Sequence, residues 1–131
     1  MILDTTFVID LIDGLPEAVE KLKSLQEQQE MLFVTTPTIF ELWTGITQSD
    51  RPEREKEKVL RVLETQLILD LHRESAEEGG IINGTLINEG QRIDPEDCLI
   101  AGIAKQYGDA VLTRNVKHFQ RVKNLFWGQD F

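Results

Sequence analysis

The chain has 131 residues, of which 40% are hydrophobic and 28% are charged, and its formal net charge at pH 7 is −9. This length and composition predict one globular domain, residues 1–131, and argue against a disordered chain. The strongly acidic balance argues against a protein that coats nucleic acid over its whole surface.

The opening of the chain predicts a strand followed by two helices. Residues 1–3 are apolar and predict a short buried strand. Thr5 or Thr6 can cap the helix that follows, in which apolar residues recur at helical spacing until it ends near Gly14. A second helix opens at Pro16, because the fixed backbone angle of proline suits the first helical position.

The next segment repeats this alternation of strand and helix. Residues 31–35 form a continuous apolar and β-branched run, which predicts a strand covered on both faces, and a helix begins at Thr36-Pro37. After a break at residues 49–52, mixed charges predict an exposed helix, and residues 67–71 predict a third strand. The buried side of this exposed helix is predicted to consist of Leu60, Leu63 and Leu67.

The second half of the chain adds two long helices. Residues 73–90 predict one of them, and the other begins after the N-cap Asp94 and runs to about Gly108. Three shorter elements follow: a strand at 110–113, a helix at 116–122 and an edge strand at 125–127. The helix at 73–90 has one side of small residues that a neighbouring element could approach closely, formed by Ala76, Gly80, Asn83, Gly84 and Ile87.

Strands and helices therefore alternate along the whole chain, which is the pattern of a parallel sheet covered by helices. We predict an α/β fold with three layers, α/β/α, around a central and mostly parallel sheet. In such sheets the functional site lies outside the carboxyl ends of the strands. Asp4 follows the first predicted strand and residues 113–115 end the fourth, so both are expected at that edge.

Three carboxylates stand in apolar surroundings: Asp4, Glu41 and Asp97. Buried carboxylates are unfavourable unless they are paired, hydrogen-bonded or bound to a cation. We therefore predict that they converge on Mg²⁺ or Mn²⁺, which prefer oxygen ligands, and that the protein is a metal-dependent hydrolase. Simpler roles are open as well. Asp4 can cap a helix, Glu41 can be an exposed helix residue, and Asp97 can complete a capping box.

Charge is distributed unevenly along the chain. Residues 1–45 carry eight acidic and two basic residues, whereas residues 105–124 carry five basic residues and one acidic residue. An acidic centre beside a basic segment suits a metal site next to the track of a phosphate backbone, although a solvated basic helix face is an equal alternative. Arg114 and Lys117 flank the end of a predicted strand, so we predict that they contact the phosphates of a nucleic-acid backbone.

Four segments resemble the successive motifs of PIN-domain ribonucleases, and most of all those of the VapC toxins of VapBC toxin–antitoxin pairs. The resemblance covers essentially the whole chain, in the right order and at fitting separations. The last two segments are the most specific. The segments are residues 2–9 (ILDTTFVI), 39–42 (IFEL), 97–104 (DCLIAGIA) and 112–119 (LTRNVKHF).

This resemblance implies a parallel-sheet α/β/α fold, Mg²⁺- or Mn²⁺-dependent endoribonuclease activity, homodimerisation, and inhibition by a cognate antitoxin whose tail covers the acidic site. Asp4, Glu41 and Asp97 match the three principal acidic positions of the family. Asn115 matches its polar or acidic fourth position and completes the implied catalytic set. Thr6 stands where the family often has Asn or Ser, and its hydroxyl can hydrogen-bond a ligand.

One departure from the family is at His118, near which many relatives have Asp or Glu. Asn115 is a weaker, neutral ligand, so the sequence favours one metal at rest, and His118 is predicted to lie at the surface or to contact RNA phosphate. Two alternatives remain. The first is a PIN-fold module that binds RNA or protein with little cleavage. The second is a receiver-like phospho-acceptor domain, which would need a Lys where Arg114 follows Thr113.

The sequence predicts neither export nor membrane insertion. The N-terminus lacks the basic stretch and cleavage site of a signal peptide, and no apolar run approaches the roughly 18 residues of a membrane span. Cys98 is the single cysteine, so no disulfide can form within the chain. We therefore expect a cytoplasmic protein.

Overall fold

Five short strands form one sheet in which every neighbouring pair is parallel. This computed structural model describes residues 1–128, and residues 129–131 of the predicted domain lie outside the described part. The strand order is β3-β2-β1-β4-β5, so the predicted α/β fold with a parallel sheet is confirmed. The strands are β1 (Ile2–Leu3), β2 (Phe33–Thr35), β3 (Leu67–Leu69), β4 (Val111–Leu112) and β5 (Trp127–Gly128).

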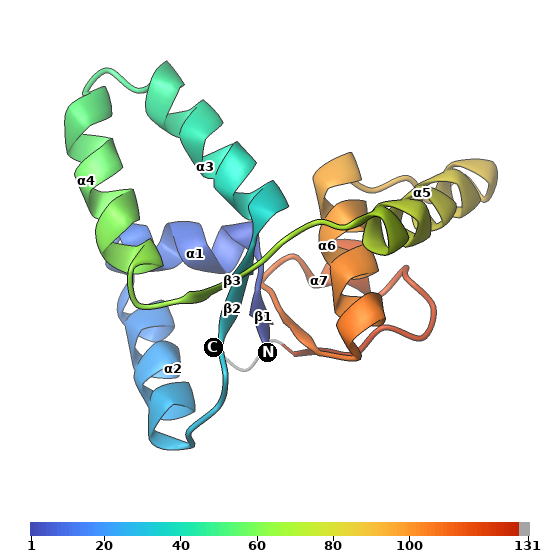
Figure 1. The fold of residues 1–131 in the computed structure, drawn as a ribbon, viewed down its shortest axis with the longest axis horizontal. Helices are drawn as coiled ribbons and strands as arrows, with labels where there is room; N and C mark the ends of the chain where they lie inside the picture. The colour runs from blue at the N-terminus through green and yellow to red at the C-terminus, as the bar shows by residue number, and fades with distance from the viewer. Residues whose placement is uncertain (129–131) are drawn as a thin grey trace.

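Helices cover both faces of this sheet, as Figure 1 shows. The first four helices gather on one side, and the last three lie on the other. In residues 1–128 no helix is both long enough and apolar enough to cross a membrane. The helices are α1 (Thr5–Ile12), α2 (Pro16–Glu27), α3 (Thr36–Gln48), α4 (Pro52–Leu63), α5 (Arg73–Asn88), α6 (Pro95–Tyr107) and α7 (Val116–Phe119).

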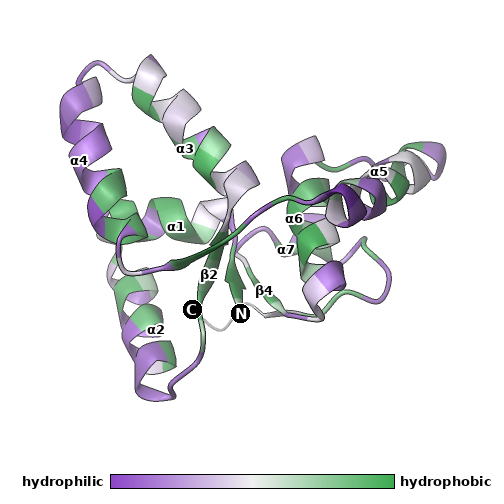
Figure 2. Cartoon of the chain, in the orientation of Figure 1, coloured by the Kyte–Doolittle hydropathy of each residue, from purple (hydrophilic) through white to green (hydrophobic). Residues whose placement is uncertain are grey.

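Two apolar cores lie on opposite faces of the sheet, because successive strand residues point to opposite sides. Ile2 and Val111 belong to the core beneath α5 and α6, whereas Leu3 and Leu112 belong to the core beneath α1 to α4. The hydropathy colouring in Figure 2 shows the apolar sides of these helices turned inward. The central strands are thus buried on both faces, as their uninterrupted apolar sequence predicts.

The structure differs from the predictions first at the ends of two strands and on one face of a helix. β2 begins at Phe33 instead of Met31, whose side chain is 61% exposed, and β3 is an edge strand that ends at Leu69. The predicted buried side of α4 was wrong at Leu60, which is 45% exposed, and at Leu67, which lies beyond the helix in β3 and is 51% exposed. Val59 is the residue of α4 that is fully buried, because the helix turns that side toward α1 and α3.

Further differences lie in the second half of the chain. β4 and α7 are shorter than predicted, and β5 lies one to two residues later than the edge strand predicted at 125–127. The small-residue side predicted on α5 meets no other part of the described chain at Gly80, which is exposed and has nothing within 4 Å of a Cβ built on it. The adjacent Gly79 faces α6 instead, where a built Cβ would lie 3.0 Å from the carbonyl oxygen of Cys98.

Candidate metal centre

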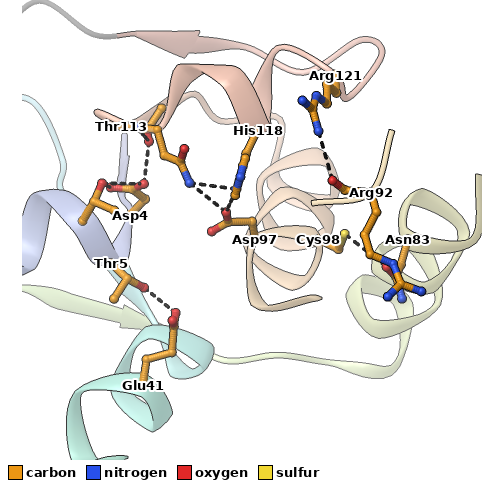
Figure 3. Close-up of polar contacts among 12 residues, drawn as sticks. Asp4, Thr5, Glu41, Asn83, Arg92, Asp97, Cys98, Thr113, His118 and Arg121 are labelled. Carbon is orange, nitrogen blue, oxygen red and sulfur yellow. Dashed lines mark hydrogen bonds and ion pairs between the residues drawn. The ribbon is translucent and has the colours of Figure 1, made fainter. Parts of the chain in front are cut away.

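The predicted site residues gather at the carboxyl ends of the central strands (Figure 3). Asp4 directly follows β1, and Thr113 directly follows β4. The strands β1 and β4 are neighbours in the sheet. Asp97 lies in the first turn of α6, and Glu41 lies on α3, which begins where β2 ends. The parallel sheet therefore delivers side chains that are far apart in sequence to one edge, as predicted.

Asp4 is 1% exposed and fully hydrogen-bonded. Its carboxylate accepts from the Thr113 hydroxyl at 2.5 Å, from the Thr6 hydroxyl at 2.9 and 3.0 Å, and from the backbone N–H of Phe7 at 2.9 Å. Asp4 itself is thus the N-cap of α1, and the prediction that Thr5 or Thr6 caps this helix was wrong. Burial and, to a smaller extent, the charge of Asp97 together raise the pKa of Asp4 to about 6, although the hydrogen bonds that it accepts oppose this shift.

Glu41 is half-buried, so its interpretation as an exposed helix residue was wrong. Its Oε1 accepts a hydrogen bond of 2.6 Å from the Thr5 hydroxyl, whose oxygen lies 2.9 Å from the hydroxyl of buried Thr38. Burial raises the pKa of Glu41, and the negative charge of Asp97 raises it further. The structure therefore brings Glu41 into the electrostatic field of Asp97.

Asp97 is 8% exposed, and its Oδ2 faces the segment that follows β4. This oxygen lies 2.7 Å from Nδ1 of His118 and accepts a hydrogen bond of 3.3 Å from the side-chain amide of Asn115. Asp94 is the N-cap residue of α6, as predicted, but its side chain makes no capping hydrogen bond. Burial raises the pKa of Asp97, whereas the hydrogen bond and charge of His118 lower it.

The donor set fits a divalent cation. Ligand atoms of Asp94, Asp97 and His118 lie within 4.8 Å of one another, and among the described residues this is the group that meets such a spacing. Asp4 and Glu41 lie beyond that spacing, although Asp97 acts on the pKa of both. Carboxylates that share a desolvated site are relieved by positive charge, and their oxygens are the ligands that Mg²⁺ and Mn²⁺ prefer.

Sequence reasoning missed two participants of this site. Asp94 was assigned to capping alone, although its spacing of three residues from Asp97 places both on one side of the helix start. Thr113, which is fully buried, was not singled out as a hydrogen-bond donor to Asp4. His118 was predicted to lie at the surface or to contact RNA phosphate, and its contact with Asp97 depends on the turn into α7, which no local pattern encodes.

The five basic residues of segment 105–124 lie in two places rather than one. Arg114 forms an ion pair with Asp10, and Lys117 is exposed on α7, without an ion pair to any residue in the described part of the chain. The other three line a pocket beside α5, in which two of them pair with glutamates: Lys105, Arg121 and Lys123. Of these five, Arg114 therefore lies within the Thr113–Asn115 loop, and Lys117 follows shortly after it.

Comparison with known proteins finds relatives that align with almost the whole chain. Residues 1–125 match the family model described as "PIN domain". A tRNA(fMet)-specific endonuclease VapC of Shigella flexneri is 30% identical over 94% of this chain and 92% of its own length. Ribonuclease VapC2 of Haemophilus influenzae is 31% identical over 92% of this chain and 89% of its own.

A solved structure extends this likeness to three dimensions. The crystal structure of DNA-bound VapBC from Salmonella typhimurium aligns with a TM-score of 0.86 and 28% identity, and it covers 97% of this chain and 95% of that chain. The receiver-like alternative does not fit the sheet, because receiver domains have the strand order 2-1-3-4-5 and this sheet has the order 3-2-1-4-5.

Proposed function

We propose a function on the premise that this chain belongs to the PIN-domain family and, within it, to the VapC group of VapBC toxin–antitoxin systems. It is the ribonuclease toxin of such a pair and cleaves RNA with the help of Mg²⁺ or Mn²⁺. The observation that carries this proposal is the placement of Asp4, Glu41 and Asp97 at one edge of the sheet, with the pKa of each raised by burial.

The residues of this chain would hold the ion through oxygen and imidazole nitrogen donors. Asp97 is the central ligand, with Asp94 and His118 beside it and with Asp4 and Glu41 completing the negative surroundings. A divalent ion held there would supply Lewis-acid chemistry, because it would polarise a phosphodiester, activate a water molecule and stabilise the departing oxygen.

Neutral side chains orient these acids. The hydroxyls of Thr6 and Thr113 fix Asp4, so its carboxylate cannot rotate freely, and the hydroxyl of Thr5 fixes Glu41. Asn115 donates to Asp97 and thus acts on the site through this carboxylate. Such preorganisation lowers the cost of ordering the site when RNA binds.

The direct test is cleavage of RNA by the purified chain. tRNA(fMet) is the first substrate to try, because the relative from Shigella flexneri carries that specificity in its name. We expect endonucleolytic products with Mg²⁺ or Mn²⁺ and none after chelation with EDTA. Binding of RNA without metal-dependent cleavage of tRNA, rRNA or mRNA would instead favour the alternative of a binding module.

Metal binding should stabilise the protein in a pH-dependent way. The pKa of Asp4, about 6, lies above its ordinary value of 3.8, so the folded state binds more protons than the unfolded state. Stability without metal should therefore rise as the pH falls from 7 toward 5, because protonation removes an unfavourable buried charge. Metal needs the deprotonated carboxylate, so its stabilising effect should shrink over the same range.

Melting curves with and without Mn²⁺ at pH 7.5 and pH 5 check this prediction. At pH 7.5 an excess of about a hundredfold over the dissociation constant should stabilise the wild type by on the order of 2–3 kcal/mol. Asp97→Asn should keep its fold and lose this increment. An equal increment at both pH values, or a full increment in Asp97→Asn, would remove these carboxylates from the metal site.

RNA phosphates are proposed to bind at Lys117 and Arg114, with Thr6 and His118 closer to the scissile bond. Lys117→Ala should weaken RNA binding without moving the cleavage position, because phosphate contacts carry little sequence information. In the inactive Asp97→Asn background, the slope of log affinity against log salt should fall by about one unit. Lys56→Ala, an exposed lysine on α4, is the matched control. Unchanged binding in Lys117→Ala would place RNA elsewhere.

Two protein partners belong to the proposal. The first is a cognate antitoxin that covers the acidic site, since the solved VapBC complex from Salmonella typhimurium pairs its toxin with one. The second is another copy of this chain, which would use the exposed side of α5 around Gly80, Gly84 and Ile87. Light scattering at tens of micromolar should give the mass of a dimer, and a monomer mass at every concentration would contradict this assembly.

A further inference from the structure

Outside the metal centre, a buried carboxylate, Asp10, forms an ion pair with Arg114. Asp10 lies on α1 and is 3% exposed, whereas Arg114 is 104 positions later in the chain. Two parallel contacts join them, from Nε of Arg114 to Oδ2 at 2.6 Å and from Nη2 to Oδ1 at 2.9 Å. Such a bidentate fork fixes the geometry of both partners, which a contact of a single lysine would not do.

Arg114 is also the middle member of three consecutive residues that each bind an acid on a different part of the fold. Thr113 donates to Asp4 at the end of β1, and Asn115 donates to Asp97 on α6. Arg114 adds the contact with Asp10 in the second turn of α1. The backbone N–H of Asn115 also donates to the Thr113 hydroxyl at 2.7 Å, so the loop is tied internally as well.

A buried carboxylate such as Asp10 lowers stability unless it is paired, so its presence needs an explanation. Stability alone is a weak one, because well-packed apolar residues often replace buried ion pairs without loss. Within residues 1–128 the side-chain hydrogen bond and ion pair of Asp10 both go to Arg114. What the pair fixes is therefore the position of the loop, and with it the hydroxyl and amide on either side of Arg114.

We propose that Asp10 is a positioning residue of the ribonuclease site, which acts through Arg114 to hold Thr113 and Asn115 against Asp4 and Asp97. This inference rests on the proposed function for its effect on cleavage. It assigns Asp10 a role although Asp10 touches neither the metal ligands nor the substrate. It also gives Arg114 a duty besides phosphate binding, because about half of its side chain stays exposed while its fork is bound.

The experiment compares Asp10→Asn, Arg114→Lys and the double variant with the wild type. Asp10→Asn keeps the shape of the side chain, and Arg114→Lys keeps the positive charge for phosphate, but both lose the fork. Asp13→Asn is the matched control, because Asp13 is an exposed acid next to the same helix. Each protein is measured for its melting temperature, its Mn²⁺ dissociation constant, its RNA affinity and its single-turnover cleavage rate.

We expect each single variant to cleave about tenfold more slowly and to bind Mn²⁺ more weakly, as residues that orient metal ligands typically do. RNA affinity should stay within about twofold of the wild type. The double variant should lose no more cleavage rate or Mn²⁺ affinity than either single variant, because both changes break the same Asp10–Arg114 ion pair. Asp13→Asn should behave as the wild type.

Three results would overturn the inference. The first is a normal cleavage rate and normal Mn²⁺ affinity in Asp10→Asn. The second is a loss in Arg114→Lys that appears in RNA affinity alone, which would make Arg114 a phosphate contact only. The third is full additivity in the double variant. If the wild type cleaves no RNA, the proposed function fails. The Mn²⁺ affinities of these variants still decide whether the Asp10–Arg114 ion pair positions the site.

Discussion

Replacing Asp4 with asparagine is expected to lower the rate of RNA cleavage by on the order of a thousandfold while the protein stays folded. Asn can still accept the hydrogen bond from the backbone N–H of Phe7, so the N-cap of α1 survives. The Thr113 hydroxyl can rotate to accept a hydrogen bond from the new amide. The negative charge that the metal requires is lost, however, and a neutral amide replaces it.

Asparagine is preferable to alanine at this position for a structural reason. Asp4→Ala would remove the cap and leave the buried hydroxyl of Thr113 without its acceptor, which together would destabilise the fold. A loss of activity in that variant would then have two explanations. Asp4→Asn separates them, because its melting temperature without metal should equal or exceed that of the wild type once the buried charge is removed.

Glu41→Gln independently tests whether removing a carboxylate of the site lowers RNA cleavage. It keeps an oxygen that can accept from Thr5, and it should also reduce cleavage and any growth arrest caused by expression by orders of magnitude. Glu17→Gln, an exposed acid in the first turn of α2, is the control and should remain fully active. Full activity of either site variant would show that its carboxylate takes no part in the reaction.

Sequence reasoning selected the candidate site residues because each carboxylate stands among apolar neighbours, where a charge is unfavourable. A carboxylate such as Asp97 at the head of an apolar helix stands out in any single sequence, and the parallel-sheet rule then says where such groups meet. The same rule predicted Asp4 and residues 113–115 at one edge of the sheet. Charges among apolar residues and the alternation of elements are local signals, and they were sufficient for the fold class.

Contacts between distant segments were beyond that reasoning. Nothing near Asp10 in the sequence indicates that its partner, Arg114, lies 104 residues later. The basic segment 105–124 was also treated as one patch, although Lys105 and Arg121 lie beside α5. The strands β1 and β4 have only two residues each, so their ends depend on hydrogen bonds to neighbours more than on propensity. The capping role of Asp4 was assigned to its neighbours because three polar residues follow one another.

The face of α5 shows how a one-residue ambiguity changes a prediction. Gly79 and Gly80 are adjacent, and either could have faced the neighbouring helix. The buried positions of α5 are Ser75, Gly79, Ile82 and Leu86, at a helical spacing that only the three-dimensional packing selects. Across from them lies Gly102 of α6, the helix that carries Asp97. This contact therefore sets the distance between α5 and the helix of the metal centre.

Gly102→Ala is accordingly expected to destabilise the protein by about 3 kcal/mol, near the upper end for overpacking. A Cβ built on Gly102 would overlap the carbonyl oxygen of Ser75 and would lie 2.8 Å from the backbone nitrogen of Gly79. Both obstacles are backbone atoms, so no side chain can rotate away, and α5 must shift as a whole. For a chain of this size, a loss of this magnitude lowers the melting temperature by roughly 10 °C.

Gly45→Ala is the matched control, and it should have the opposite sign. Gly45 is an exposed glycine of α3 outside the proposed dimer face, and a Cβ built on it meets nothing within 4 Å. Alanine in an open helix position should stabilise the fold by about 0.5–1 kcal/mol, because it has the higher helix propensity. Thermal and urea unfolding of both variants provide the measurement. Equal stability of Gly102→Ala and the wild type would mean that α5 can move away from α6 freely, and the Mn²⁺ affinity of the variant would then show whether Asp97 depends on this contact at all.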